Sequence, residues 1–459
     1  MNPNHHSRRR FLQLTATGLA ASPWLGPLAW AQSSLPRKAI GMPAPGRMNL
    51  PTSPPSAPSG DSLGVAVIGL GGYGINRVMP ALARAHRCHV AAVVSGNPEK
   101  AGTVAAAYGL ADDAIYSYDN FDAIAGDDRV EAVYVVLPSG LHADWTEKAF
   151  AAGKHVLCEK PLANTVAEAQ QMADAARVAR AGGVRSMCGF NYRRVPAVTL
   201  MRQLVADGRI GTIRHVRAVY LQDWILDPDF PLVWRLQKDK AGSGALGDIG
   251  AHIIDATQFV TGQRIARVSG LTETFVKRRP LPAGSSGLSA SAGGGSADDA
   301  EPATGEVTVD DAALFMARLD GGAVASYEAT RFAAGRKNGL RIEINGSLGS
   351  VAFDFERMNE LEFFDATRPA AEQGFTRIIV TEPEHPYLSA WWPPGHGIGY
   401  EHSFTHQARD FVAALAAGDD PTPSFDDALQ VQQALAAVEE SAGLGEWVTV
   451  DPANTTAPA

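Results

Sequence analysis

Cysteine is scarce in this chain, which has only Cys88, Cys158 and Cys188 among its 459 residues. An odd number of cysteines argues against a disulfide framework, and all three lie in or beside apolar segments. We therefore expect three buried free thiols. Stability is instead expected from burial, because 45% of the residues are hydrophobic, enough for two domains with substantial cores.

Two further features are missing, and each excludes a class of partner. The 40 basic and 49 acidic side chains give a formal net charge of −9, without a basic stripe beyond the first residues, so nucleic acid is a poor candidate partner. No apolar stretch of the sequence reaches the roughly 20 residues that a bilayer-spanning helix needs. We therefore expect no membrane anchor.

Residues 1–31 have the pattern of an export signal. Arg8-Arg9-Arg10 precede Phe11-Leu12, a weakly apolar stretch follows, and Ala29-Trp30-Ala31 has the form of a cleavage site. Paired arginines before Phe-Leu are typical of a twin-arginine leader, which predicts export to the periplasm. Residues 32–62 are rich in proline, serine and alanine, and we expect them to form an extended arm or linker.

A glycine-rich turn follows the first apolar run. Residues 65–74 read V-A-V-I-G-L-G-G-Y-G, with a helical pattern at 75–85 and a second apolar run at 90–94. In a βαβ unit the first glycine permits the tight turn, the second lets the backbone approach a pyrophosphate, and the third lets helix and strand pack closely. We assign this turn to a dinucleotide cofactor, with Gly69, Gly71, Gly72, Tyr73 and Gly74 as its binding residues.

The residues after the second run bear on the choice of cofactor. NAD sites usually carry Asp or Glu there to bind the ribose 2′-hydroxyl, whereas this chain has Ser95, followed by Asn97 and Lys100. A hydroxyl, an amide and an ammonium group suit a 2′-phosphate, which a carboxylate would repel. The sequence therefore favours NADP, with NAD as the alternative; in the other interpretation Lys100 is a solvated residue at a helix start.

The hydrophobic pattern of this α/β chain changes near residue 192. Over residues 63–192 apolar strands alternate with helices such as Thr165–Arg180, which predicts an NAD(P)-binding Rossmann domain with a doubly wound parallel sheet. Over residues 193–450 a helix at 197–207 precedes strands that alternate apolar and polar residues, which predicts an α+β domain with a large, mostly antiparallel open sheet. Residues 280–305, rich in glycine, serine and alanine, are expected to be a disordered hairpin loop. The expected strands are 65–70, 90–94, 132–137, 155–157 and 184–190 in the first domain, and 213–220, 267–275, 312–319, 323–329, 340–345, 350–354 and 360–364 in the second.

Two further motifs carry reactive side chains. Cys158-Glu159-Lys160-Pro161 ends a predicted strand of the first domain. Ligands of such sheets lie beyond the carboxyl ends of the strands, so Lys160 is expected to point toward the nicotinamide pocket. In the second domain a glycine-rich turn opens a helix that carries Asp248 and His252, four residues apart and therefore on one helical face.

Together, the glycine turn, Glu159-Lys160-Pro161 and Asp248-x-x-x-His252 resemble the motifs of the glucose-fructose oxidoreductase, inositol dehydrogenase and MocA (Gfo/Idh/MocA) family. The resemblance covers nearly the whole chain after the leader. It implies an NAD(P)-dependent oxidoreductase that acts on CH–OH groups of sugars or polyols, as a homo-oligomer, dimer or tetramer. It also implies a cofactor site that includes Leu137, Pro138, His142, Glu159 and Lys160.

The chemistry of these residues agrees with that family. Oxidation of a sugar alcohol removes a hydroxyl proton while hydride leaves the same carbon, and an imidazole with a pKa of about 6.5 suits this exchange. His252 is the predicted base, Asp248 its orienting partner, and Lys160 the donor that stabilises the charge developing on the oxygen. The predicted sugar contacts are Arg193, Gln222, Trp224, Trp234 and Arg235, whose alternative role is packing between the domains.

Resemblances within the family separate the two halves of the chain. The Ser95–Lys100 segment, the arm and the leader are similar to the periplasmic glucose-fructose oxidoreductases, which hold NADP without releasing it. This similarity implies a retained cofactor, with the arm packed over it or acting as a plain tether. The second domain departs from that branch at His252, where those enzymes have tyrosine, and is similar there to inositol dehydrogenases.

Other interpretations remain beside this one. An ordinary dehydrogenase would exchange its cofactor, and the same fold also occurs in non-catalytic sugar or dinucleotide sensors, against which the combination of Lys160, Asp248 and His252 argues. His402-x-x-x-His406 has a spacing suited to a metal, but the sequence offers no third ligand nearby, so we predict no metal site.

Overall fold

The computed structural model describes residues 48–56, 58, 60–282 and 303–450. The predicted leader, the first part of the arm and most of the 280–305 segment therefore lie outside the described residues. The described end of the arm contacts the first domain: the backbone N–H of Asn49 donates to Oδ1 of Asn76 at 2.8 Å, and Pro54 lies against Gly109.

Six parallel strands form the sheet of the first domain, in the order β3-β2-β1-β4-β5-β6. All residues of β1 are buried, as expected of a strand covered by helices on both faces. The order reverses between β1 and β4, and the glycine turn follows β1 at this switch point, where such sheets bind their ligands. The predicted Rossmann fold is confirmed. The strands are β1 Leu63–Ile68, β2 Cys88–Val94, β3 Ile115–Tyr116, β4 Ala132–Val135, β5 His155–Cys158 and β6 Ser186–Cys188.

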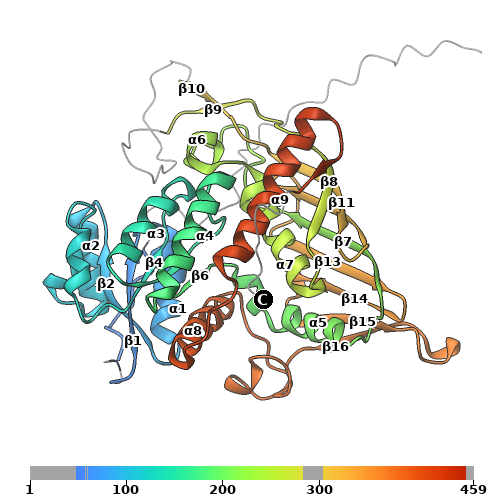
Figure 1. Ribbon diagram of the computed structural model, residues 1–459, viewed down its shortest axis with the longest axis horizontal. Helices are drawn as coiled ribbons and strands as arrows, with labels where there is room; N and C mark the ends of the chain where they lie inside the picture. Colours follow the sequence, from blue (N-terminus) through green and yellow to red (C-terminus); the bar gives the residue numbers. More distant parts are fainter. Residues whose placement is uncertain (1–47, 57, 59, 283–302, 451–459) are drawn as a thin grey trace, which may run out of the picture. The chain divides into compact units, whose positions relative to one another are not determined.

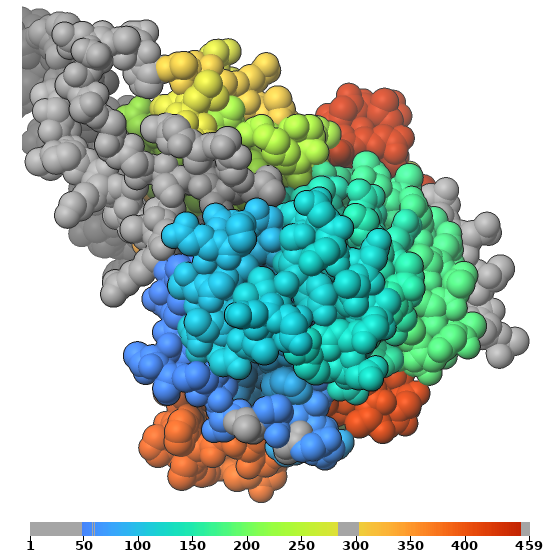
Figure 2. Space-filling model, turned by 90° about the vertical axis from the view of Figure 1, so that its left-hand side faces the viewer, coloured from blue at the N-terminus to red at the C-terminus, as the bar shows by residue number. Residues whose placement is uncertain are grey.

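Four helices connect these strands, and their ends follow local sequence signals. The helix predicted at 75–85 is present, but it begins as a π-helical turn over Gly74–Val78 and continues as α1. At the start of α4, Thr165 and Glu168 form a reciprocal capping box, which explains why this helix was clear in the sequence. The helices are α1 Met79–Arg84, α2 Pro98–Tyr108, α3 His142–Ala151 and α4 Val166–Ala181 (Figure 1). Their outer surfaces form most of the face seen in Figure 2, from blue to green.

Nine strands form the sheet of the second domain, in the order β16-β15-β14-β13-β7-β12-β11-β8-β17. Among the strand pairs of this sheet in the described residues, only β7–β12 is parallel, so the predicted mostly antiparallel sheet is confirmed. The strands are β7 Ile213–Leu221, β8 Ile265–Glu273, β11 Ala312–Leu319, β12 Val324–Thr330, β13 Gly339–Gly346, β14 Gly349–Asp354, β15 Glu360–Asp365, β16 Phe375–Ile379 and β17 Val448–Thr449. Along β11 buried and exposed residues alternate, because only one face packs against helices.

The helices that follow residue 193 do not all pack against the second domain. Figure 1 shows α5 Pro196–Ala206, α7 Ala251–Thr261 and α9 Phe425–Leu444 against one face of the large sheet. In contrast, α8 Glu401–Ala417 packs against α1, and three of its residues join the hydrophobic core of the first domain: Ala408, Phe411 and Val412. A single boundary at residue 193 therefore does not describe the packing, because the chain returns to the first domain near its end.

The loop over residues 222–236 carries most of the predicted sugar contacts, and a short hairpin holds this loop. Strand β9 Arg278–Pro280 pairs with β10 Thr304–Glu306, so the ends of the 280–305 segment form a hairpin as predicted. Arg279 is fully buried and donates to the backbone carbonyls of Ile225 and Asp227, both at 2.7 Å. This guanidinium holds the 222–236 loop, with the 3-10 turn Trp234–Leu236 at its end, against the hairpin. The four-residue helix α6 Lys238–Ala241 follows.

The three cysteines are free and buried, as predicted. Within the described residues, no helix combines the length and the apolar character that a membrane span requires.

Candidate active site

The glycine turn has the shape that a dinucleotide requires. Gly69 has φ +99°, and a Cβ atom there would lie 2.5 Å from the carbonyl oxygen of Val136. A Cβ atom at Gly74 would lie 2.6 Å from the carbonyl oxygen of Gly69. At Gly71, in contrast, a Cβ atom would meet no described atom within 4 Å, so the backbone is open to an approaching group. These residues fit a pyrophosphate at the start of the helix, beside Gly72 and Tyr73.

The segment between β2 and α2 caps the N-terminus of helix α2. The Ser95 hydroxyl accepts a hydrogen bond from the backbone N–H of Asn97 at 3.1 Å, and Asn97 Oδ1 caps the helix by accepting from the N–H of Lys100 at 2.9 Å. The amide oxygen of Asn97 is thus used by the helix rather than left for a ligand. A helix N-terminus without a carboxylate at the preceding strand end is compatible with a phosphate.

His142 has a positioning role that its place in the sequence does not reveal. It is buried, and its ring nitrogens lie 2.9 Å from the carbonyl oxygen of Leu137 and 3.0 Å from that of Pro161. Both ring nitrogens therefore face the protein backbone. We conclude that His142 ties the Leu137-Pro138 segment to the segment after Lys160 instead of contacting the cofactor through its ring.

Glu159 joins the glycine turn to strand β5. Its Oε1 accepts hydrogen bonds from the hydroxyl groups of Tyr134 at 2.6 Å and Tyr73 at 3.3 Å, and its Oε2 accepts one from the backbone N–H of Lys160 at 3.3 Å. Burial raises the pKa of this carboxyl group. Glu159 therefore fixes two predicted cofactor-binding segments relative to each other.

Lys160 and Asp248 meet where the two domains face each other. The Lys160 Nζ donates a hydrogen bond to the backbone carbonyl of Asp248 at 2.6 Å and lies 3.6 Å from its Oδ1. The guanidinium of Arg331, which is fully buried, lies 3.7 Å from Oδ2. Burial opposes ionisation of Asp248, but Lys160, Arg235 and Arg331 outweigh it and lower its pKa. Asp248 is therefore a carboxylate that faces several cations.

His252 is not oriented by Asp248, which corrects the sequence-based expectation. The Nδ1 atom of His252 is buried and has no hydrogen-bond partner among the residues that the structure describes. The reason lies in the partners of Asp248: its carboxylate oxygens face the Lys160 ammonium group at 3.6 Å and the Arg331 guanidinium at 3.7 Å. Burial, assisted by the charge of Lys160, lowers the pKa of His252 well below its ordinary value.

The predicted sugar contacts separate into two groups. Arg193 is buried and forms an ion pair with Asp255, with Nε at 3.0 and 2.9 Å from the two carboxylate oxygens, so its role is structural and not substrate binding. Gln222 and Trp224 lie together, since the Trp224 Nε1 donates to Oε1 of Gln222 at 3.0 Å.

The other pair lies at the end of the same loop. The guanidinium of Arg235 stacks on the ring of Trp234 at 4.4 Å, and its charge acts on Asp248. These four residues remain candidates for the sugar site.

Two family models match the chain. One is described as an oxidoreductase family with an NAD-binding Rossmann fold and matches residues 63–184; the other is the GFO/IDH/MocA C-terminal domain and matches residues 198–352. The chain belongs to the Gfo/Idh/MocA family. As predicted, it is an NAD(P)-dependent oxidoreductase of sugars.

Individual relatives cover most of this Gfo/Idh/MocA protein. Levoglucosan dehydrogenase of Pseudarthrobacter phenanthrenivorans is 40% identical over 359 residues, which are 78% of this chain and 88% of that protein. An oxidoreductase domain protein from Kribbella flavida is 53% identical, with a TM-score of 0.77 over 85% of this chain and 99% of that chain. Levoglucosan dehydrogenase in complex with NADH and levoglucosan is 38% identical, with a TM-score of 0.75 over the same shares, 85% and 99%. The expected closeness to the periplasmic branch of the family stays a prediction.

The His402/His406 pair is built into the protein rather than directed at a ligand. His406 accepts a hydrogen bond from Nε1 of Trp391 at 2.7 Å, and its Nδ1 lies 3.0 Å from the carbonyl oxygen of Arg194. His402 accepts from the backbone N–H of Gly399 through Nδ1 at 3.0 Å. Across the described ranges no group of three or more His, Cys, Asp or Glu is arranged to hold a metal ion.

Sequence reasoning missed Arg331 and a group of tyrosines beside His252. Arg331 follows the β12 strand in an ordinary-looking Thr-Arg-Phe sequence, and Tyr192 lies just after Phe190-Asn191 at the end of the first domain. Neither belongs to a spaced motif. The only available signal was their position at the ends of predicted strands, where ligands of such folds bind.

Proposed function

We propose that this chain is an exported enzyme that interconverts a sugar hydroxyl and a carbonyl group with NADP(H), and that Lys160 and His252 act on the reacting oxygen. One observation carries the proposal: the Lys160 ammonium group of the first domain contacts the helical turn of Asp248, one turn before His252 in the second domain. A substrate oxygen at this junction is within reach of both a cationic donor and a neutral imidazole.

Each residue has a defined task in this proposal. Lys160 donates a hydrogen bond to the substrate oxygen and stabilises its developing negative charge. His252 accepts the hydroxyl proton; because Nδ1 is enclosed, Nε2 is the nitrogen assigned to this step. Its lowered pKa keeps the ring neutral near pH 7, with a lone pair free to accept a proton. Asp248 holds Lys160 in place.

The open backbone at Gly71 supports a dinucleotide with its pyrophosphate at the helix start. The nicotinamide, when bound, supplies the acceptor for the hydride. NADP is favoured because Ser95 replaces the usual carboxylate and Lys100 lies one helical turn further on. The test is the variant Ser95→Asp/Lys100→Ala, in which we expect the ratio of Kd values to shift toward NAD. Unchanged relative affinities would exclude this assignment.

A compact cyclic sugar, with hydroxyl groups for an amide and a C–H face for an indole, is the proposed substrate class. The 40% identity to levoglucosan dehydrogenase supports it, together with the pairing of Gln222 and Trp224 near the end of β7. Substrate profiling with levoglucosan, glucose, xylose and inositol tests this class. Turnover of inositol alone would favour the polyol interpretation.

Retention of the cofactor completes the proposal. The leader predicts a compartment without an evident pool of NADP, so one sugar would reduce the bound cofactor and a second carbonyl compound would reoxidise it. An ordinary exchanging dehydrogenase is the second candidate, because a related levoglucosan dehydrogenase is known both with NADH and in its apo form.

Dialysis separates the two candidates. Enzyme purified from the periplasm is dialysed and assayed with two sugars, with and without added NADP. We expect full activity without addition and parallel double-reciprocal lines for donor and acceptor. Complete dependence on added NADP would establish the exchanging dehydrogenase instead.

A further inference from the structure

The ring of His252 is held by aromatic contacts. It stacks on Tyr192, with ring centroids 4.3 Å apart and an interplanar angle of 19°. Phe190 and Tyr220 contact it edge-on, at 6.2 and 5.9 Å. In the described part of the chain no residue hydrogen-bonds to Nδ1 of His252. The three neighbouring rings therefore determine the plane of the imidazole.

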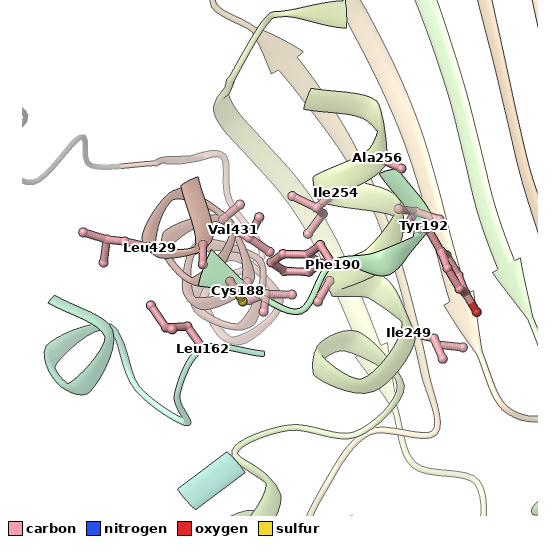
Figure 3. Packing of buried hydrophobic residues seen from close by; sticks show 14 of the residues in the cluster. Leu162, Cys188, Phe190, Tyr192, Ile249, Ile254, Ala256, Leu429 and Val431 are labelled. Carbon is pink, nitrogen blue, oxygen red and sulfur yellow. The ribbon is translucent and has the colours of Figure 1, made fainter. Parts of the chain in front are cut away.

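Tyr192 is itself firmly held. Its hydroxyl group hydrogen-bonds to that of Tyr220 at 2.5 Å, and Tyr220 donates in turn to Oδ1 of Asn338 at 2.6 Å. Its ring also packs against Phe355, with centroids 4.8 Å apart. In Figure 3 Phe190 lies beside Val431, whereas Tyr192 extends the other way, with its hydroxyl group toward the strands of the large sheet.

The same chain of hydrogen bonds continues to the predicted sugar contacts. Asn338 Oδ1 also accepts from Nε2 of Gln222 at 3.1 Å, and Oε1 of Gln222 accepts from the indole N–H of Trp224 at 3.0 Å. Three side chains, those of Tyr220, Asn338 and Gln222, thus connect the Tyr192 ring beside His252 to Trp224. A shift of Gln222 or Trp224 therefore reaches the imidazole through hydrogen bonds and one stacked pair.

We propose that Tyr192 is the positioning residue of His252: its ring fixes the plane of the imidazole, and its hydroxyl, through Tyr220 and Asn338, connects that plane to Gln222 in the sugar site. The inference rests on the proposed function, in which His252 acts on the reacting oxygen. Tyr192, an aromatic residue of the first domain, thus orients the His252 ring, a role that the sequence pattern predicts for Asp248.

The test compares three variants of the full chain. Tyr192→Leu removes the stacked ring, and a misplaced base costs on the order of 10²-fold in kcat. Tyr192→Phe keeps the ring and loses only the hydroxyl, so kcat should fall by about two- to tenfold, the range for one hydrogen bond. The matched control is Tyr327→Leu: Tyr327 is equally buried, stacks on Phe315 at 4.6 Å and hydrogen-bonds to Thr257 at 2.9 Å, but does not touch His252. It should lower Tm and leave kcat near the wild-type value.

Coupling to His252 distinguishes positioning from general packing. In the His252→Ala background, Tyr192→Leu should cause no further loss of kcat, because a residue that acts only through His252 has nothing left to position. The same fold-loss in both backgrounds, or wild-type kcat in Tyr192→Leu, would overturn the inference.

Two further outcomes are distinguishable. A wild-type kcat in the single variant His252→Ala would refute both the proposed base and the inference. A low kcat in His252→Ala together with a wild-type kcat in Tyr192→Leu would refute only the inference. If Tyr192→Leu does not fold, Tyr192→Phe carries the same test, with its smaller loss expected to vanish in the His252→Ala background.

Discussion

The two halves of the active site are held by different forces. In the charged half, defined as Lys160, Asp248 and Arg331, an ammonium group and a guanidinium share one carboxylate. In the aromatic half, defined as His252, Tyr192 and Tyr220, an imidazole lies in stacked and edge-on contact with phenol rings. The cations lower the pKa of the Asp248 carboxyl group, whereas burial lowers the pKa of the His252 imidazole, so the difference in environment assigns the two chemical roles.

The comparison also predicts that the two halves respond differently to substitution. Coulombic attraction falls slowly with distance, so we expect small shifts in the charged half to have little effect. Stacking requires direct contact, and a buried ring that loses its neighbour leaves a cavity. Variants in each half should therefore differ in both size and kind of effect.

The largest effect is expected from Lys160→Met, which breaks the charged half. Loss of the donor should lower kcat by about 10²- to 10⁴-fold while the cofactor still binds. Steady-state kinetics and a cofactor titration measure the two quantities. The matched control is Lys154→Met, because Lys154 also donates to a backbone carbonyl, that of Asp127 at 3.1 Å, but lies away from the site. Equal losses in both variants would mean that Lys160 serves the fold rather than the chemistry.

Asp248→Asn should have a smaller effect. The hydrogen bond from Lys160 goes to the backbone carbonyl of residue 248, which the substitution keeps, while the carboxylate that balances Lys160 and Arg331 is lost. We expect kcat to fall by about tenfold, equivalent to about 1.4 kcal/mol. A loss as large as that of Lys160→Met would contradict the view that Asp248 only positions the lysine.

The pH dependence of kcat/KM tests how the charge of Lys160 affects the protonation of His252. Burial and the charge of Lys160 lower the pKa of His252, so the ring stays neutral as the pH falls through about 6.5 and becomes protonated only below it. The acid limb should therefore lie below pH 6.5 in the wild type. In Lys160→Met one cause of the lowering is gone, and the limb should move upward. An acid limb above pH 6.5 in the wild type would exclude His252 as the base.

The smallest effect is on stability. Burial lowers the pKa of His142, His252 and His406, the last to about 4. As the pH falls, these histidines are protonated in the unfolded chain before they are protonated in the folded protein. The free energy of unfolding is therefore highest above about pH 6.5 and decreases as the pH falls toward the pKa values of the folded state. Between pH 7.5 and 5 we expect Tm to fall by about 5 °C. His406→Gln should flatten this dependence, and an unchanged slope in that variant would show that His406 does not contribute.

The sequence predicted the fold and the cofactor turn well because both depend on local patterns. The buried strand β1 and the alternating strand β11 follow from their hydrophobic periods, and the steric demands on Gly69 and Gly74 lie within the turn itself. Short edge strands such as β16 have no buried face, so no hydrophobic period marked them.

The site was harder to predict, for reasons visible in single residues. The i, i+4 spacing predicts that Asp248 and His252 face each other, but nothing in the sequence marks Lys160 and Arg331, the cations that the Asp248 carboxylate faces instead. The sequence predicts Arg193 as a sugar contact because nothing in it marks the ion pair with Asp255, which lies 62 positions away. Tyr192 was not identified because its partners come from β7 and from the loop before β13.

The role of His252 as the base determines the rate of nicotinamide reduction in a single turnover, which can be measured directly. Purified wild-type enzyme and the His252→Ala variant, each with NADP bound to the same extent, are mixed with excess levoglucosan, or with the best substrate found by profiling, and the absorbance of the reduced nicotinamide is followed. The account predicts that the variant binds cofactor normally and reduces it about 10²-fold more slowly or worse. Reduction at the wild-type rate would contradict it.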